Sequence, residues 1–496
     1  MRKKLKNLAA LVDGAEIIGN ADTFITDIVQ DSRQAGRGSM FVCMEGAHVD
    51  GHTFIGDVAK KGAAAIITQR KGVKAPAGVA VLVVPNLDEA LKVIVPAFFD
   101  YPGQQLRMIG ITGTNGKTTT SYLVRAMLRQ AGYKVGLIGT IQIMIGDKIL
   151  PVHNTTPNVV DLQRTLHQMV EDGVQYAVME VSSHALDQGR IAGCEFDTAV
   201  FTNLTQDHLD YHKTMENYRD AKAKLFDMLG GPGLKPGKTA VVNIDDAAGA
   251  YMLEHAACEH ITYAVESEKA NLRAVEVRVR QTGASLAVQG SFGRIKLNLH
   301  ITGMFNIYNV LGAVGAAVAE NVPVNIIEQA LENFMGVPGR FELVDCGQPF
   351  AVVVDYAHTP DGLENILRTA RQITEKKIIT VFGCGGDRDK TKRPIMGRIA
   401  AELSDAVIAT SDNPRTEDPA AILEDVMKGV EEKIGTKPYE KIQDRHEAIF
   451  VAIAMAQPGD TVVIAGKGHE NYQILKTGTI HFDDREVARE ALGGIV

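Results

Sequence analysis

LRMIGITGTNGKTTTSYLVRAMLRQ, residues 106–130, places an apolar run, a glycine-rich turn and a segment with helical spacing in immediate succession. In such an arrangement the backbone amides of the turn can surround phosphate oxygens, and the amino end of the helix adds a positive potential. The strict pattern GxxxxGK[ST] is not met, because Ile111 occupies its first glycine position. The tighter GTNGKT still lies between a predicted strand and a predicted helix, so the stretch predicts a phosphate-binding loop in an α/β domain.

The side chains of this loop indicate a nucleoside triphosphate as its ligand. Lys117 can reach the terminal phosphates, and the Thr118 hydroxyl suits magnesium. The predicted nucleotide-binding residues of the loop are Gly113, Thr114, Asn115, Gly116, Lys117, Thr118 and Thr119. The loop alone does not distinguish a kinase, a switch protein, a motor or a ligase.

The same pattern of a short Val- and Ile-rich run followed by a polar burst recurs along the chain. The further runs are KVGLIG, YAVMEV, TAVFTNL, TAVVNID, FAVVVDY, KIITVFG, DAVIATS and DTVVIAG. Continuous apolar runs are typical of parallel strands buried on both faces. Ligands bind beyond the carboxyl ends of such strands, and turns alone do not require so many His, Asp, Asn and Arg residues. We therefore expect the polar bursts to form the functional site.

The chain has 496 residues, which is the length of about three domains. Residues 1–100 carry a small α/β pattern of their own and end at YPGQQ, a candidate linker. A second boundary is expected near MGVPGRFE, residues 335–342, where Pro338 and Gly339 interrupt a helix. The sequence thus predicts an α/β protein with domains over 1–100, 101–336 and 337–496.

Composition excludes several classes of protein. Hydrophobic residues make up 45% of the chain and charged residues 23%, the mixture of a folded globular protein. The net charge of -8 argues against general nucleic-acid binding, and no apolar run approaches the roughly 18 to 20 residues of a membrane span. Five scattered cysteines without a CxxC pair are typical of reduced thiols. We therefore expect a cytoplasmic protein without nucleic-acid or membrane partners, and we expect a monomer.

One lysine stands in an unusual position. Read as a helix at about 100° per residue, YRDAKAKLFDML places Lys222 in the middle of an apolar arc and Lys224 on the polar side. A lysine on a core-facing stripe is costly unless it is paired or chemically altered. The simpler alternative is a lysine whose stem packs in the core while its ammonium reaches outward to solvent.

Twelve motifs in one order resemble the Mur ligase family across essentially the whole chain. They are DSR (31–33), GTNGKTT (113–119), NTTP (154–157), EVSSHALDQGR (180–190), TNLTQDHLDYH (202–212), YRDAKAKLF (218–226), GMFNIYN (303–309), GRFE (339–342), DYAHTPDGL (355–363), GCGGDRDKTKRP (383–394), DNPR (412–415) and GKGHE (466–470). The resemblance implies an ATP-dependent amide ligase that joins an amino acid to a UDP-N-acetylmuramoyl precursor in peptidoglycan synthesis. It also implies three domains. The first recognises the UDP substrate, the central P-loop domain binds ATP and has a mostly parallel sheet, and the Rossmann-like C-terminal domain binds the amino acid.

Within that family, DNPR implies the branch that adds meso-2,6-diaminopimelate. This diacid carries a second carboxylate at its far end, and the guanidinium of Arg415 can pair with a carboxylate in bidentate fashion, whereas it would repel the distal cation of L-lysine. The implied reaction joins meso-2,6-diaminopimelate to the D-glutamate γ-carboxylate of UDP-N-acetylmuramoyl-L-alanyl-D-glutamate through an acyl phosphate, with ATP as co-substrate and Mg²⁺ as cofactor.

The resemblance also implies roles for residues position by position. The implied catalytic residues are Lys117, Glu180, His208 and Lys222. The implied metal ligands are Thr118, Glu180, His208 and Lys222, the last as a carbamate. Beyond the phosphate loop, the implied ATP-binding residues are Asn306, Asn309, Arg340 and Asp355. The residues implied for the UDP substrate are Ser32, Asn154, Thr155, Thr156, Ser182, Gln188 and Arg190, with uridine contacts around Gln30 and residues 47–49. The residues implied for diaminopimelate are Arg388, Asp412, Asn413, Pro414, Arg415, Gly466 and Glu470.

Competing interpretations remain open at the level of the sequence. The same ligase could add L-lysine, and neighbouring enzymes of the family add D-alanyl-D-alanine or glutamate to folate. A P-loop protein that senses a nucleotide without making a product is an alternative from another class, which the many Asn, His and Arg residues at the strand ends disfavour. Neither His358 nor His469 is assigned as the base for the attacking amine.

Overall fold

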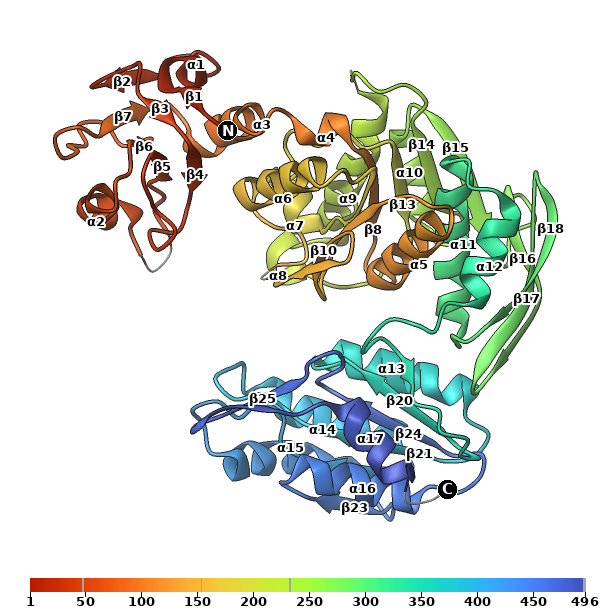
Figure 1. The fold of residues 1–496 in the computed structure, drawn as a ribbon. Helices are drawn as coiled ribbons and strands as arrows, with labels where there is room; N and C mark the ends of the chain where they lie inside the picture. The colour runs from red at the N-terminus through yellow and green to blue at the C-terminus, as the bar shows by residue number, and fades with distance from the viewer. Residues whose placement is uncertain (47–48, 153, 232, 494–496) are drawn as a thin grey trace. The chain divides into compact units, whose positions relative to one another are not determined.

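A computed structural model describes residues 1–46, 49–152, 154–231 and 233–493. The chain forms two compact units, one of Met1–Tyr263 with Gly312–Val322 and one of Ala264–Leu311 with Pro323–Val496 (Figure 1). Both units combine parallel strands with crossover helices. The α/β class predicted from the apolar runs is therefore confirmed, whereas the three domain boundaries stay a prediction.

The first unit begins with a five-stranded sheet in the order β2-β7-β6-β5-β4. These strands are β2 (Glu16–Ile18), β4 (Asp27–Val29), β5 (Ser39–Val42), β6 (Ala65–Thr68) and β7 (Ala80–Val83). Strands β4 to β7 are parallel, and β2 pairs antiparallel with β7. A two-stranded sheet of β1 (Lys3–Lys4) and β3 (Phe24–Ile25) and the helices α1 (Leu5–Ala9), η1 (Gly51–Phe54), α2 (Ile55–Lys60) and α3 (Leu87–Phe98) complete this part.

The first unit also contains strands of a larger sheet, in the order β11-β10-β9-β12-β8-β13-β14-β15. These strands are β8 (Arg107–Thr112), β9 (Val135–Ile138), β10 (Ile143–Ile145), β11 (Lys148–Leu150), β12 (Tyr176–Glu180), β13 (Thr198–Phe201), β14 (Thr239–Asn243) and β15 (Glu259–Ala264). The six strands from β9 to β15 in this order are parallel. The connecting helices are α4 (Pro102–Gln105), α5 (Lys117–Gln130), α6 (Val159–Glu171), α7 (Ser183–Asp187), α8 (Leu209–His212), α9 (Met215–Gly230) and α10 (Gly249–His255).

The register of this sheet brings the polar bursts together. Val178 of β12 pairs with Ile109 of β8, and Val200 of β13 pairs with Ile111, so the three strands end at one edge. Their side chains are buried on both faces, as expected for continuous apolar runs. The loops after β8, β12 and β13 therefore emerge side by side.

The second unit contains an antiparallel sheet of β16 (Leu272–Arg280), β17 (Gly283–Gly290) and β18 (Gly293–Leu299). In β16 and β18 more buried and less buried residues alternate, a pattern that a search for continuous apolar runs does not find. They are followed by α11 (Met304–Ala319) and α12 (Val324–Glu332). None of the helices in the described ranges combines the length and apolar character that crossing a bilayer requires.

A six-stranded sheet in the order β19-β20-β24-β21-β22-β23 forms the rest of this unit. Its strands are β19 (Glu342–Leu343), β20 (Ala351–Asp355), β21 (Ile378–Phe382), β22 (Ala406–Ala409), β23 (Tyr439–Lys441) and β24 (Thr461–Ala465), and all but β19 are parallel. Its helices are α13 (Pro360–Ile373), α14 (Lys392–Leu403), α15 (Pro419–Lys433), α16 (Arg445–Met455) and α17 (Asp484–Gly493), and a hairpin of β25 (Tyr472–Leu475) and β26 (Gly478–His481) follows β24. The doubly wound sheet agrees with the predicted Rossmann-like architecture.

Candidate active site

The phosphate loop lies between β8 and α5, as the sequence predicts. Gly113 and Gly116 have φ values of 147° and 85°, and a Cβ atom on Gly113 would collide with the Oγ1 atom of Thr202. Lys117 Nζ donates hydrogen bonds to the carbonyl oxygens of Gly113 and Thr114, each at 2.8 Å. The ammonium thus lies against the loop whose amides are expected to bind phosphate.

The loop after β13 holds the phosphate loop in place. Thr202 Oγ1 donates to the Asn115 carbonyl oxygen at 2.6 Å, and Asn115 N donates to Asn203 Oδ1 at 3.0 Å. Thr114 N donates to the Asn203 carbonyl oxygen at 2.9 Å. The sequence analysis did not single out Thr202 and Asn203, although their place directly after an apolar run is the signal that marks the other site residues. Their contacts preorganise the loop in its described conformation.

Glu180, at the end of β12, is fully buried and has its carboxylate hydrogen-bonded on both oxygens. Thr118 Oγ1 donates to Oε2 at 2.9 Å, Thr140 Oγ1 donates to the same oxygen at 3.0 Å, and Thr140 N donates to Oε1 at 2.9 Å. Two predicted metal ligands, Thr118 and Glu180, are therefore in direct contact. Thr140 is a further site residue that the sequence analysis missed, because no motif contains it.

Lys222 lies in α9 and is 1% exposed, while Lys224 is exposed on the same helix. The helical reading that placed Lys222 among apolar residues is confirmed. Lys222 Nζ donates to the Gly113 carbonyl oxygen at 2.8 Å and lies 4.3 Å from the centre of the Tyr218 ring. Burial lowers the pKa of the Lys222 amine well below its ordinary value, and the nearby charge of Lys117 lowers it further. The alternative of an ammonium reaching outward to solvent is wrong.

His208 lies just before α8 with a φ of 54°. Its ring centre is 4.8 Å from that of His184 and 5.9 Å from that of Tyr218, and the Tyr218 hydroxyl is 3.1 Å from Thr114 Oγ1. His208 therefore belongs to a group of rings beside the phosphate loop. Burial is the main cause that lowers the pKa of the His208 imidazole.

Three residues predicted to bind the UDP substrate adjoin Glu180. Thr155 Oγ1 is 3.0 Å from Thr140 Oγ1. Thr156 Oγ1 donates to the Glu180 carbonyl oxygen at 2.9 Å and accepts from Ser182 N at 3.1 Å. The motifs NTTP and EVSSH thus form one hydrogen-bonded group at the edge of the sheet.

Gln188 and Arg190 extend this group. Arg190 Nε donates to Gln188 Oε1 at 2.8 Å, and Arg190 Nη1 donates to the Thr156 carbonyl oxygen at 3.2 Å. Gln188 Nε2 donates to the Tyr211 hydroxyl at 3.3 Å. Five of the seven residues predicted for the UDP substrate therefore lie in one connected region.

The remaining two are placed differently. Asn154 is exposed, and Ser32 follows β4 of the five-stranded sheet, where its carbonyl oxygen accepts from Lys61 Nζ at 2.7 Å. The predicted uridine contacts fall partly outside the described residues, because Ala47 and His48 are not among them. Gln30 Nε2 is 3.6 Å from the sulfur of Met44.

In the second unit, the DNPR and GKGHE motifs are joined by hydrogen bonds. Asn413 Nδ2 donates to Glu470 Oε2 at 2.9 Å, and Gln473 Nε2 donates to the Asp412 carbonyl oxygen at 2.6 Å. Gly466 has a φ of 124°, and a Cβ atom there would lie 2.7 Å from Asp412 Oδ2. The two motifs, far apart in the sequence, therefore pack as one site at the carboxyl ends of β22 and β24.

Arg415 sits in this site with a φ of 54°. Its backbone N donates to the Ile474 carbonyl oxygen at 3.0 Å, and its Nη1 donates to the Gly386 carbonyl oxygen at 2.8 Å. The loop that carries Arg388 is fixed from the same side, because Thr416 Oγ1 donates to Asp387 Oδ1 at 2.7 Å. Hydrogen bonds thus connect the loop that carries Arg388 to the loop that carries Arg415. Pro414, between Asn413 and Arg415, is part of the same loop.

The four other residues predicted for ATP also belong to the second unit. Asn306 and Asn309 are buried in α11, where Asn309 Nδ2 donates to Asn306 Oδ1 at 3.0 Å. Asp355 ends β20 and accepts from Phe341 N at 2.7 Å, and burial raises its pKa while the charge of Arg340 opposes this. Asp355 therefore fixes the GRFE loop next to Arg340.

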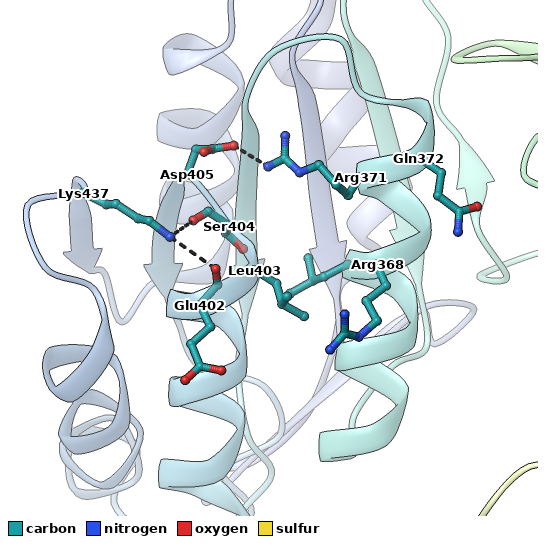
Figure 2. A pocket seen from close by; sticks show the side chains of 9 residues that line it. Arg368, Arg371, Gln372, Glu402, Leu403, Ser404, Asp405 and Lys437 are labelled. Carbon is teal, nitrogen blue, oxygen red and sulfur yellow. Dashed lines mark hydrogen bonds and ion pairs between the residues drawn. The ribbon is translucent and has the colours of Figure 1, made fainter.

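One cavity of the second unit is not part of this site. Its volume is about 520 Å³, and it is lined by Leu367, Arg368, Arg371, Gln372, Glu402, Leu403, Ser404, Asp405 and Lys437. Figure 2 shows Arg371 paired with Asp405, and Lys437 donating to the carbonyl oxygens of Glu402 and Ser404. Asp405 directly precedes β22, so this cavity lies at the amino ends of the strands, opposite the loops described above.

The donor set around Glu180 fits magnesium. Mg²⁺ prefers oxygen ligands and keeps several waters, so a site needs only one or two protein oxygens beside the substrate phosphates. Thr118 and Glu180 supply a hydroxyl and a carboxylate directly behind the phosphate loop. Among the described residues no group of three or more His, Cys, Asp and Glu side chains is arranged as a metal site.

Comparison with known proteins assigns the chain to a family. Three family models match it: "Mur ligase family, catalytic domain" over residues 25–99, "Mur ligase middle domain" over 111–317 and "Mur ligase, glutamate ligase domain" over 339–468. The protein of Bacillus velezensis named UDP-N-acetylmuramoyl-L-alanyl-D-glutamate--2,6-diaminopimelate ligase is 51% identical over 473 residues, which are 95% of each chain. The protein of the same name from Clostridium tetani is 44% identical over 99% of each chain.

Solved structures agree with this assignment. A structure with the same ligase name has a TM-score of 0.68 and 33% identity, covering 100% of this chain and 99% of its own. A D-alanyl-D-alanyl ligase from Acinetobacter baumannii has a TM-score of 0.66 at 21% identity, covers 95% of this chain and 96% of its own, and shares the fold. With full-length relatives of this identity and three matching family models, the chain belongs to the Mur ligase family.

Proposed function

We propose that this protein is an ATP-dependent ligase that joins meso-2,6-diaminopimelate to the D-glutamate γ-carboxylate of UDP-N-acetylmuramoyl-L-alanyl-D-glutamate, in peptidoglycan precursor synthesis. The observation that carries the proposal is the DNPR loop, in which Asn413 donates to Glu470 and the Arg415 guanidinium donates to the carbonyl oxygens of Asn413 and Gly386, in a chain otherwise built like its named relatives. An amino acid with two carboxylates and two ammonium groups suits this combination of one guanidinium and two carboxylates.

The reaction proceeds in two balanced steps. The γ-carboxylate attacks the γ-phosphorus of ATP, and the bond from that phosphorus to the β–γ bridging oxygen breaks. ADP departs, and the substrate becomes an acyl phosphate. The amine of diaminopimelate then attacks the acyl carbon, the carbon–oxygen bond to phosphate breaks, and an amide and inorganic phosphate form while the amine loses a proton. Because two anions must meet in the first step, charge neutralisation matters more than an enzyme nucleophile.

The chain's own groups can supply part of this neutralisation. Lys117 Nζ lies on the phosphate loop, and α5 begins at Lys117, so the amino end of this helix adds its positive potential there. Thr118 and Glu180 would hold magnesium, which supplies further positive charge against the phosphates when it is bound. His208, in the ring group beside the loop, is the further candidate for the metal site.

We also propose that Lys222 carries a carbamate, formed when its neutral amine attacks CO₂ and releases a proton. Burial favours the neutral amine, which is the form that reacts. The carboxylate of the carbamate would then be a ligand of a second magnesium, together with His208 and Glu180. The Lys222→Ala variant should be inactive, short-chain carboxylates should restore part of its activity, and intact mass at high bicarbonate should show the added group. Full activity of the untreated variant would contradict this role.

The remaining site residues keep the roles that the family resemblance implies. Thr155, Thr156, Ser182, Gln188 and Arg190 form the connected region proposed for the UDP-muramoyl dipeptide, with Ser32 and Asn154 as additional contacts. Asn306, Asn309, Arg340 and Asp355 are proposed around ATP. Arg388, Pro414 and Gly466 complete the amino-acid site with the residues named above. We further propose that the enzyme acts as a cytoplasmic monomer.

Phosphate release with purified protein tests the function. Turnover should require ATP, Mg²⁺, UDP-N-acetylmuramoyl-L-alanyl-D-glutamate and meso-2,6-diaminopimelate together. Replacing meso-diaminopimelate with L-lysine should lower kcat/KM by at least 100-fold, because the Arg415 guanidinium meets an ammonium instead of a carboxylate. Equal use of L-lysine would refute the assignment of the amino acid, and tight ATP binding without any substrate-dependent turnover would favour a nucleotide sensor instead.

A further inference from the structure

Lys467, the second residue of GKGHE, has its side chain fully inside the second unit. It follows the end of β24, and its exposed fraction is 0%. A buried ammonium is costly unless it is paired and hydrogen-bonded. The family resemblance gave Gly466 and Glu470 a role in this motif and left Lys467 without one.

The Lys467 ammonium bridges two side chains of the amino-acid site. Its Nζ donates to Asn413 Oδ1 at 3.2 Å and to Glu470 Oε2 at 3.2 Å. Asn413 Nδ2 donates to the same Glu470 oxygen at 2.9 Å. The three side chains thus form a closed triangle in which the cation contacts both of the groups expected to meet the substrate.

This triangle fixes the orientation of the Asn413 amide. The two ends of an asparagine amide have nearly the same shape, so only their hydrogen-bond partners distinguish them. Asn413 Oδ1 accepts from two donors, Lys467 Nζ and Ile474 N, the latter at 2.9 Å. A flipped amide would place its NH₂ group against both donors and its oxygen against the Glu470 carboxylate, which leaves three buried groups without partners.

The same cation also limits the freedom of Glu470. Two donors already occupy Oε2, so that oxygen is turned toward the interior. The carboxylate is held on one side while its side chain stays 14% exposed. The remaining surface of the carboxylate is then presented in one orientation to the incoming ammonium.

We propose that Lys467 is a positioning residue for the amino-acid substrate: it acts through Asn413 and Glu470, setting the direction of the amide and of the carboxylate. This inference rests on the proposed function. Its consequence is specific, because losing the cation should weaken binding of diaminopimelate and leave the two nucleotide substrates unaffected.

The experiment compares full-length Lys467→Met with the wild-type enzyme. We expect the KM for diaminopimelate to rise about tenfold or more, the size of a lost hydrogen bond to a charged group, while the KM values for ATP and the UDP-dipeptide stay within twofold. The matched control is Lys437→Met, which removes an ammonium that donates to the carbonyls of Ala401 and Ser404 at 2.8 Å at the other end of the sheet. The control should lose thermal stability without a change in any KM.

A double-mutant cycle separates positioning from general destabilisation. In an Asn413→Ala background, Lys467→Met should raise the KM for diaminopimelate less than it does alone, because the amide it orients is gone and only its effect through Glu470 remains. Equal effects in both backgrounds, or an unchanged KM in a folded Lys467→Met enzyme, would overturn the proposal. If Lys467→Met does not fold, Lys467→Gln is judged by the same two criteria. A wild-type enzyme that does not use diaminopimelate would refute the proposed function instead, independently of these variants.

Discussion

The Thr118 hydroxyl donates a hydrogen bond of 2.9 Å to Oε2 of Glu180, which links the first turn of α5 to the end of β12. Glu180 is fully buried, and each of its oxygens already accepts a hydrogen bond. A carboxylate held in this way behind a phosphate loop has a fixed position before any nucleotide arrives. Its geometry supports the proposed magnesium site more directly than any single motif of the sequence.

Replacing Glu180 with glutamine should therefore remove activity while preserving the fold. The amide keeps the shape of the side chain but not the negative charge that a magnesium ion needs. We expect kcat to fall at least 100-fold, the usual scale for losing one preorganised electrostatic group. Phosphate release over a magnesium titration measures this, with circular dichroism as the control for folding. An unchanged magnesium dependence would count against Glu180 as a ligand.

Gly113→Ala should destroy nucleotide binding through steric conflict. The new Cβ atom would collide with Thr202 Oγ1, and the φ of 147° disfavours any side chain. Gly56→Ala in α2 is the matched control, because nothing lies within 4 Å of its Cβ position. Fluorescent ATP-analogue binding should be lost in the first variant and retained in the second. Normal affinity of Gly113→Ala would show that the loop can rearrange at little cost.

Arg445 and Asp484 form a fully buried ion pair in the second unit, with two hydrogen bonds of 2.7 Å each. Arg445→Met should destabilise the protein by about 3–5 kcal/mol, because it leaves a buried carboxylate without its partner. The double variant Arg445→Met with Asp484→Leu should recover much of the loss. Urea denaturation measures both.

Arg371→Met provides the comparison for this prediction. Arg371 pairs with Asp405 at a surface where both side chains are more than a third exposed. Its loss should cost no more than about 1 kcal/mol. If Arg371→Met and Arg445→Met lowered the free energy of unfolding equally, burial of the ion pair would not be the cause of the destabilisation.

His469 should make stability depend on pH. Burial, with the charge of Arg340 as the next cause, lowers the pKa of His469 from 6.5 to about 4. Between these values the unfolded chain binds a proton that the folded chain does not, so stability falls as pH decreases from 6.5 to 4 and the effect is absent above 6.5. In the His469→Gln variant, the thermal-denaturation midpoint should depend less on pH over this range than it does in the wild-type protein.

The sequence predicted the strands well, because continuous apolar runs are hard to satisfy except in parallel sheets buried on both faces. It also placed Lys222 correctly, since helical spacing alone put it among apolar neighbours. It assigned no role to Thr140, Asn203 or Lys467, because each acts through a hydrogen bond to a residue far along the chain. The strands β16 and β18 were missed as well, since polar and charged residues alternate with their apolar residues, which leaves no continuous apolar run.

The hydrogen bonds that fasten the DNPR loop to β25 have an evolutionary implication. Arg415 N donates to the Ile474 carbonyl oxygen, and Ile474 N donates to Asn413 Oδ1, so the loop proposed to recognise the amino acid is aligned by a hairpin encoded some sixty residues later. A lineage that acquires a different building block must therefore remodel both segments in concert. Grafting the four-letter motif alone into a relative should fail to transfer its preference, whereas transplanting motif and hairpin together should succeed.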